Sequence, residues 1–135
     1  MDPSPGDVTV FAIDDHRAIL DSVTMIVAAA SGFRIVGVAE SGAAAADTLD
    51  VSPALDPDLI LIDLNMPGEN GIDAARHLME RGAKSAIVLM STMDRDDLPD
   101  GALAPPIRGF LPKSELSTDA LERVWAEVAA AGPTD

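Results

Sequence analysis

The chain has 135 residues, with 23 acidic side chains against 9 basic ones, and it contains no cysteine. This length fits one domain with a buried core, and a 47% share of hydrophobic residues is typical of a globular protein rather than a disordered one. The lack of cysteine excludes disulfides and cysteine-ligated zinc or iron–sulfur sites. The net charge of −14 argues against direct nucleic-acid binding, because attraction to phosphates requires a basic surface.

We expect a cytoplasmic protein with no membrane partner. No apolar run approaches the roughly 20 residues that span a bilayer, and residues 1–7 have neither the basic nor the apolar region of a secretory signal. Two prolines, a glycine and two acids within residues 1–7 predict a flexible N-terminal tail.

Five short apolar runs follow the tail. Runs of this kind, with little polar alternation, are typical of parallel strands that are covered on both faces. The predicted strands are Val8–Ile13, Phe33–Ala39, Leu59–Ile62, Ala86–Met90 and Ile107–Leu111.

Segments with helical patterns separate these runs. Apolar residues at i, i+4, i+7 and i+8 from Ile19 form one helical face. Ser41, Asn70 and Ser117 are suited to cap three further helices, with Gly82 just past the end of the helix after Asn70. This alternation predicts an α/β doubly wound fold with a five-stranded parallel sheet over residues 8–131, followed by a short tail at 132–135.

The segment between the fourth and fifth strands resists the pattern. A helix belongs there by alternation, but Pro99 and Gly101 weaken it and Pro105-Pro106 end it. We expect a short or irregular fourth helix of at most about two turns.

Polar side chains occupy the strand ends, and the carboxyl ends of parallel strands are where open α/β sheets bind ligands. Clustered carboxylates repel one another and raise their own pKa values unless a cation joins them, and Mg²⁺ takes oxygen ligands. A hydroxyl and an ammonium nearby suit phosphoryl transfer, in which an Asp can be the nucleophile. The strand-end residues are Asp14, Asp15, Asp63, Ser91, Thr92 and Lys113.

Four motifs carry a family resemblance: FAIDDH at 11–16, LILIDLNMPGENG at 59–71, IVLMS at 87–91 and GFLPK at 109–113. In this order and spacing they resemble the receiver domain of two-component response regulators, in particular the NarL/FixJ branch. The resemblance covers nearly the whole chain and implies a flavodoxin-like sheet with strand order 2-1-3-4-5. It also implies a signalling phosphoprotein that catalyses only its own phosphorylation and dephosphorylation, and not an enzyme for an external metabolite.

The resemblance implies a role for each motif residue. Asp63 would accept a phosphoryl group from a sensor histidine kinase or a phosphotransfer protein. Mg²⁺ would be held by Asp14, Asp15, Asp63 and the backbone carbonyl of Asn65. The phosphoryl-contacting and switch residues would be Ser91, with Thr92 as its competitor, together with Lys113 and Phe110, whose ring would turn inward on activation. Asn65 and Met93 would tune dephosphorylation.

Some features depart from the family pattern. Lys113 is followed by Ser114 where many receivers have proline, and Pro112 precedes it. In the family, the face made by helix four, strand five and helix five often carries the contacts with an output domain or a dimer partner. A short or irregular fourth helix therefore puts the usual output mechanism in doubt. We expect one receiver with no output domain in this chain, switching partner or output-domain interactions, and possible homodimerisation.

Other interpretations stay open. A phosphorylation-independent docking module would share this fold. An aspartyl-nucleophile phosphatase would require a second acid two residues after its nucleophile, where this chain has His16, and a flavin-binding module would require a phosphate loop without Asp14 and Asp15. Asp14 or Asp15 alone could simply cap the first helix, and we expect His16 and His77 to be surface residues without metal partners.

Overall fold

A computed structural model describes residues 7–52 and 56–130 of the chain. The predicted tails at 1–7 and 132–135 therefore lie outside the described residues, apart from Asp7. In chain order the elements are β1 (Val8–Ile13), α1 (Arg17–Ala29), β2 (Phe33–Ala39), α2 (Gly42–Val51), β3 (Leu59–Asp63), β4 (Asn65–Met66), β5 (Glu69–Asn70), α3 (Gly71–Glu80), β6 (Ala86–Ser91), the 3-10 turn η2 (Arg95–Asp97), β7 (Ile107–Pro112), the 3-10 turn η3 (Lys113–Glu115) and α4 (Thr118–Ala130).

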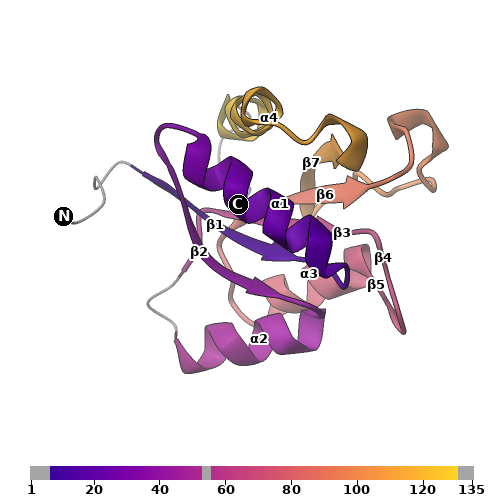
Figure 1. Ribbon diagram of the computed structural model, residues 1–135. Helices are drawn as coiled ribbons and strands as arrows, with labels where there is room; N and C mark the ends of the chain where they lie inside the picture. Colours follow the sequence, from indigo (N-terminus) through magenta and orange to yellow (C-terminus); the bar gives the residue numbers. More distant parts are fainter. Residues whose placement is uncertain (1–6, 53–55, 131–135) are drawn as a thin grey trace.

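The five long strands form one parallel sheet in the order β2-β1-β3-β6-β7 (Figure 1). Counted along the chain as strands of this sheet, that is the predicted order 2-1-3-4-5, so the flavodoxin-like fold is confirmed. Helices α1 and α4 cover one face of the sheet, while α2 and α3 cover the other. Strand order reverses between β1 and β3, and this is where such sheets bind ligands.

Both faces of the central strands are buried, which explains their continuous apolar runs. Ile60 and Ile62 of β3 pack with α2 and α3, whereas Leu59 and Leu61 pack with α1 and α4. All four are at most 1% exposed, since successive side chains of a strand point to opposite faces.

The predicted helix caps are present. Ser41 Oγ accepts a hydrogen bond from Ala44 N–H (3.0 Å), and Ser117 Oγ accepts one from Ala120 N–H (3.0 Å). Asn70 Oδ1 accepts from the backbone N–H groups of Ile72 and Asp73 at 2.7 and 3.1 Å. These bonds satisfy amides that have no partner within their own helix, and they fix where α2, α3 and α4 begin.

The fourth helix is reduced to the single turn η2, as the prolines predicted. From Asp100 the chain continues through turns to β7. Ala102 and Leu103 of this segment still pack on the core near Ile107. An irregular strap, residues 94–106, therefore takes the place of the fourth helix beside β7. In the described part of the chain, no helix is long and apolar enough to cross a membrane.

Candidate functional site

An acidic cluster lies at the carboxyl ends of β1 and β3. Asp14 and Asp15 follow β1 directly, and Asp63 is the last residue of β3. One side-chain ligand atom from each of these residues and from His16 lies within 4.8 Å of the others. Asp14 and Asp63 are buried, at 0% and 3% exposed. The tertiary structure therefore brings together the three carboxylates that the sequence pattern grouped.

Lys113 reaches this cluster from the end of β7. Its Nζ lies 2.7 Å from Asp14 Oδ2 and 3.0 Å from Asp63 Oδ1, and its side chain is 7% exposed. Three carboxylates and one ammonium leave a net charge of −2 at neutral pH. That excess negative charge in a buried site favours a divalent cation.

The pKa values of the buried pair shift in the same direction. Burial raises the pKa of Asp63 above its ordinary 3.8, and the charge of Asp14 adds to this, although the contact with Lys113 and the backbone of Asn65 oppose it. Burial alone would lower the pKa of Lys113, but its contacts with Asp14 and Asp63 outweigh burial and raise it above 10.5. Lys113 therefore stays protonated at neutral pH, while the ionised form of Asp63 is destabilised.

The donor set fits a hard divalent cation. Asp63 Oδ2 and Asp15 Oδ1 are buried atoms without a hydrogen-bond partner among the described residues, although Asp15 Oδ1 lies 3.4 Å from His16 Nδ1. Asp14 Oδ2 also lacks a well-directed hydrogen bond, although it lies 2.7 Å from Lys113 Nζ as an ion pair. Carboxylate oxygens left unpaired in a buried site are costly unless a ligand meets them, and oxygen is the donor that Mg²⁺ prefers.

The loop after Asp63 is held by close backbone packing. Gly71 N–H donates to the carbonyl of Leu64 (2.7 Å), and a Cβ at Gly71 would overlap the carbonyl oxygen of Asp63. Only glycine permits this approach of α3 to the end of β3. The intervening β4–β5 hairpin is also tied to α2, because Gly42 N–H donates to Glu69 Oε1 at 2.8 Å.

The hydroxyl candidates are separated by burial. Ser91 ends β6 and is 1% exposed, whereas Thr92 is exposed. Ser91 Oγ accepts a hydrogen bond from Met93 N–H (3.0 Å), which leaves its own O–H proton free to donate. Met93 is half-buried, and Asn65 is exposed in β4 beside the cluster.

Phe110 already points into the protein, at 5% exposed. The Arg95 guanidinium lies 5.8 Å from the centre of the ring, in the range of a cation–π contact. The structure thus has the Phe110 ring in the inward position that we predicted for the activated state. A switch that acts through this ring would also require a second state in which the ring points outward.

His16 is the residue whose place the sequence interpretation missed. Its side chain is 62% exposed, as expected, but Nδ1 lies 3.0 Å from Asp14 Oδ1 and 3.4 Å from Asp15 Oδ1. Asp14 Oδ1 also accepts from His16 N–H at 2.8 Å, so Asp14 shapes the turn before α1 and does not cap the helix from its N-cap position, which is His16. The position of His16 directly after Asp15 in the sequence was the signal that could have indicated this contact.

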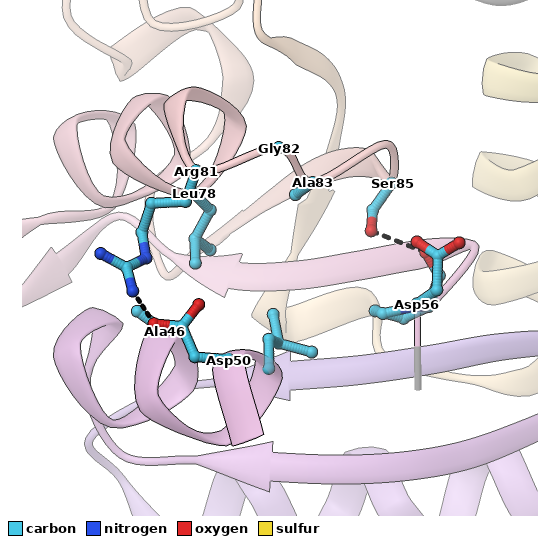
Figure 2. A pocket seen from close by; sticks show the side chains of 10 residues that line it. Ala46, Asp50, Asp56, Leu78, Arg81, Gly82, Ala83 and Ser85 are labelled. Atoms are coloured by element: carbon cyan, nitrogen blue, oxygen red, sulfur yellow. Dashed lines mark hydrogen bonds and ion pairs between the residues drawn. The ribbon is translucent and has the colours of Figure 1, made fainter. Parts of the chain in front are cut away.

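A separate cavity of about 220 Å³ lies near the amino-terminal ends of β3 and β6, away from the acidic cluster at the carboxyl ends of the strands (Figure 2). It is lined mainly by the ends of α2 and α3, with Leu49 and Leu78 at its wall and an ion pair between Arg81 and Asp50 at its rim. None of the clustered carboxylates lines it. This cavity is therefore separate from the acidic cluster.

Comparisons with known proteins agree on one family. The family model of the response regulator receiver domain matches residues 10–124. The nitrate/nitrite response regulator protein NarL of Escherichia coli K12 is 34% identical over 124 residues, which cover 92% of this chain and 55% of that protein. The transcriptional regulatory protein DegU of Brevibacillus brevis is 31% identical over 125 residues, covering 93% of this chain and 51% of DegU.

Structural similarity agrees with these matches. The signal receiver domain of the putative response regulator NarL from Mycobacterium tuberculosis has a TM-score of 0.78 and 29% identity, over 95% of this chain and 99% of that domain. The chain spans about half the length of the curated relatives that it matches. The fold, the strand-end residues and these matches together show that the chain belongs to the response regulator receiver domain family, a signalling family, and that it is NarL-like within it.

Proposed function

We propose that this receiver domain accepts a phosphoryl group on Asp63 from a sensor histidine kinase or a phosphotransfer protein, with Mg²⁺ held at the acidic cluster. The observation that carries the proposal is the arrangement of Lys113 between Asp14 and Asp63, at 2.7 and 3.0 Å, while Asp63 Oδ2 has no partner among the described residues. One oxygen of the acceptor is thereby oriented and the other is left available.

In the proposed step a carboxylate oxygen of Asp63 attacks the phosphorus of a phosphohistidine. The O–P bond forms as the P–N bond breaks, and the leaving imidazole nitrogen takes up a proton. The product is an acyl phosphate on Asp63. The negative charge that gathers on the phosphoryl oxygens lies within reach of the Lys113 ammonium.

Asp14, Asp15, Asp63 and the backbone carbonyl of Asn65 would hold the cation. When bound, Mg²⁺ supplies positive charge that offsets the carboxylates and orients phosphoryl oxygens. The −2 charge of the four side chains becomes zero with the cation in place, which removes the repulsion that otherwise opposes an incoming phosphoryl group.

Ser91 is the proposed hydroxyl donor to the phosphoryl group. Its Oγ already accepts from Met93 N–H, so its remaining proton is the one that a phosphoryl oxygen would receive. A shift of Ser91 toward Asp63 would alter this bond and move the segment that packs over Phe110. The change would then reach the irregular strap at 94–106, the surface through which we propose that partners or an output domain sense it.

Intact-mass measurement after incubation with Mg²⁺ and acetyl phosphate tests the acceptor. We expect one phosphate adduct on the wild-type chain and on the control Asp47→Asn, whose side chain is exposed on α2. Asp63→Asn should show none. A folded wild-type chain without any adduct would instead favour a phosphorylation-independent docking module, for which the missing fourth helix is the structural argument.

A further inference from the structure

We propose that His16 is a direct ligand of the cation at the acidic cluster, and that the site therefore prefers first-row transition-metal dications such as Co²⁺ over Mg²⁺. This inference rests on the cation site of the proposed function and adds one ligand to it. To the Asn65 carbonyl and the three carboxylates, the proposal adds one imidazole, so that the side-chain ligands come from Asp14, Asp15, Asp63 and His16.

The geometry places the imidazole nitrogen among the carboxylates. Nδ1 of His16 lies 3.0 Å from Asp14 Oδ1 and 3.4 Å from Asp15 Oδ1, and the whole set fits within 4.8 Å. Two ligands on opposite sides of an ion with bonds of about 2.1–2.2 Å are roughly 4.2–4.4 Å apart. A small contraction is enough to bring these atoms to coordination distance.

The side chains are also free to make that contraction. The His16 ring is 62% exposed, so rotation of the ring meets little packing. Its contacts with Asp14 and Asp15 come from the turn between β1 and α1, where the imidazole nitrogen already faces the carboxylate oxygens.

A second observation points to a ligand at the same place. Asp63 is 3% exposed and belongs to a different strand, yet its Oδ2 has no hydrogen-bond partner among the described residues. A buried carboxylate oxygen normally has one. Asp63 contributes a ligand atom to the same cluster as His16, so the unmet oxygen and the imidazole share one site.

The ligand types decide which cation benefits. Mg²⁺ takes oxygen donors and gains little from a nitrogen, whereas imidazole suits the later transition metals and affinity for mixed N and O sites rises along the first row. The imidazole should therefore add affinity for Co²⁺ and leave that for Mg²⁺ nearly unchanged. The chain contains two histidines, which makes this difference simple to test.

The test compares wild type, His16→Gln and His77→Gln, the last being a matched control because His77 is exposed on α3. Calorimetry measures the affinities for Mg²⁺ and for Co²⁺. Loss of even an outer-shell partner typically costs 10–100-fold in metal affinity, so we expect His16→Gln to lose about tenfold or more for Co²⁺. The affinity for Mg²⁺ should change less than about twofold, and His77→Gln should match wild type for both cations.

Proton NMR of the Co²⁺-loaded protein provides a readout independent of affinity. A coordinated imidazole gives strongly shifted ring signals, which should be present in wild type and His77→Gln and absent in His16→Gln. Circular dichroism checks the fold of His16→Gln, and His16→Ala should behave in the same way.

Equal losses for the two cations in His16→Gln, or shifted imidazole signals that persist in it, would overturn the inference. If Asp63→Asn abolishes Mg²⁺ binding while His16→Gln leaves Co²⁺ affinity intact, only this inference fails. If neither cation binds wild type, the proposed function fails with it.

Discussion

The buried charge of Asp63 should make the wild-type chain less stable than Asp63→Asn in the absence of a divalent cation. The substitution keeps the size of the side chain and removes one carboxylate from a site of net charge −2. Burial and the nearby Asp14 raise the pKa of Asp63, so its ionised form is the costly one at neutral pH. Replacing a residue at the centre of the site is therefore expected to stabilise the fold.

The magnitude follows from the distances. Lys113 Nζ lies 3.0 Å from Asp63 Oδ1, an attraction of about 5.5 kcal/mol at an effective dielectric constant of about 20. Asp14 and Asp15 each have a carboxylate oxygen within 4.8 Å of Asp63, which gives a repulsion of about 3.5 kcal/mol or more from each at the same dielectric constant. Repulsion thus exceeds attraction by about 1–2 kcal/mol, and desolvation acts in the same direction.

Urea unfolding at pH 7 with a chelator measures the difference. A gain of about 1–2 kcal/mol, with a slope of about 1–3 kcal/mol per molar urea, raises the midpoint by roughly 0.3–2 M. The folded pKa of Asp63 lies above 3.8, so the advantage of Asp63→Asn is full above that folded pKa and disappears as the pH falls toward 3.8. Asp47→Asn, on the exposed surface of α2, is the control and should change little.

Mg²⁺ should reverse the order. The wild-type site gains about 2.7 kcal/mol when Mg²⁺ is at about one hundred times its Kd, which exceeds the deficit of about 1–2 kcal/mol in the chelator. Asp63→Asn gains less because it has lost a charged ligand. A lower urea midpoint for Asp63→Asn in the chelator would show that attraction to Lys113 dominates, and the charge argument would be wrong.

The remaining predictions concern Lys113, Gly71 and Ser117. Lys113→Met should cost about 3 kcal/mol by urea unfolding at pH 7, because it leaves buried carboxylates unpaired. The pKa of Lys113 is raised above 10.5 in the folded state. The stability from its ion pairs with Asp14 and Asp63 is therefore full below pH 10.5 and is lost as the pH rises through the higher folded pKa. Unfolding measured from about pH 7 to 12 should show this loss in wild type and not in Lys113→Met. Gly71→Ala should cost about 1–3 kcal/mol and weaken Mg²⁺ binding in calorimetry, since its Cβ would overlap the Asp63 carbonyl, and unchanged values would mean that the backbone yields freely. Ser117→Ala should lower the free energy of unfolding by about 1 kcal/mol through loss of the α4 cap, with Mg²⁺ affinity unchanged.

Local sequence patterns determine most of the secondary structure of this protein. The apolar runs set the strands because a parallel strand that is buried on both faces must be apolar throughout. Asn70 and the cap serines set the helix starts because capping needs only a few neighbouring residues. Pro99 and Pro105 excluded a regular fourth helix because proline removes a backbone donor and clashes with the preceding turn.

The tertiary structure decided what depends on distance across the sheet. Asp14 and Lys113 are far apart in sequence, and only the parallel order of β1, β3, β6 and β7 brings the Lys113 ammonium to 2.7 Å from the Asp14 carboxylate. The positions of these residues at the strand ends predicted that they lie together at the carboxyl ends of the sheet. They did not predict that Asp63 Oδ2 has no hydrogen-bond partner among the described residues, or that the His16 ring nitrogen faces Asp14. Side-chain direction at a site is set by packing and charge among segments that the sequence presents separately.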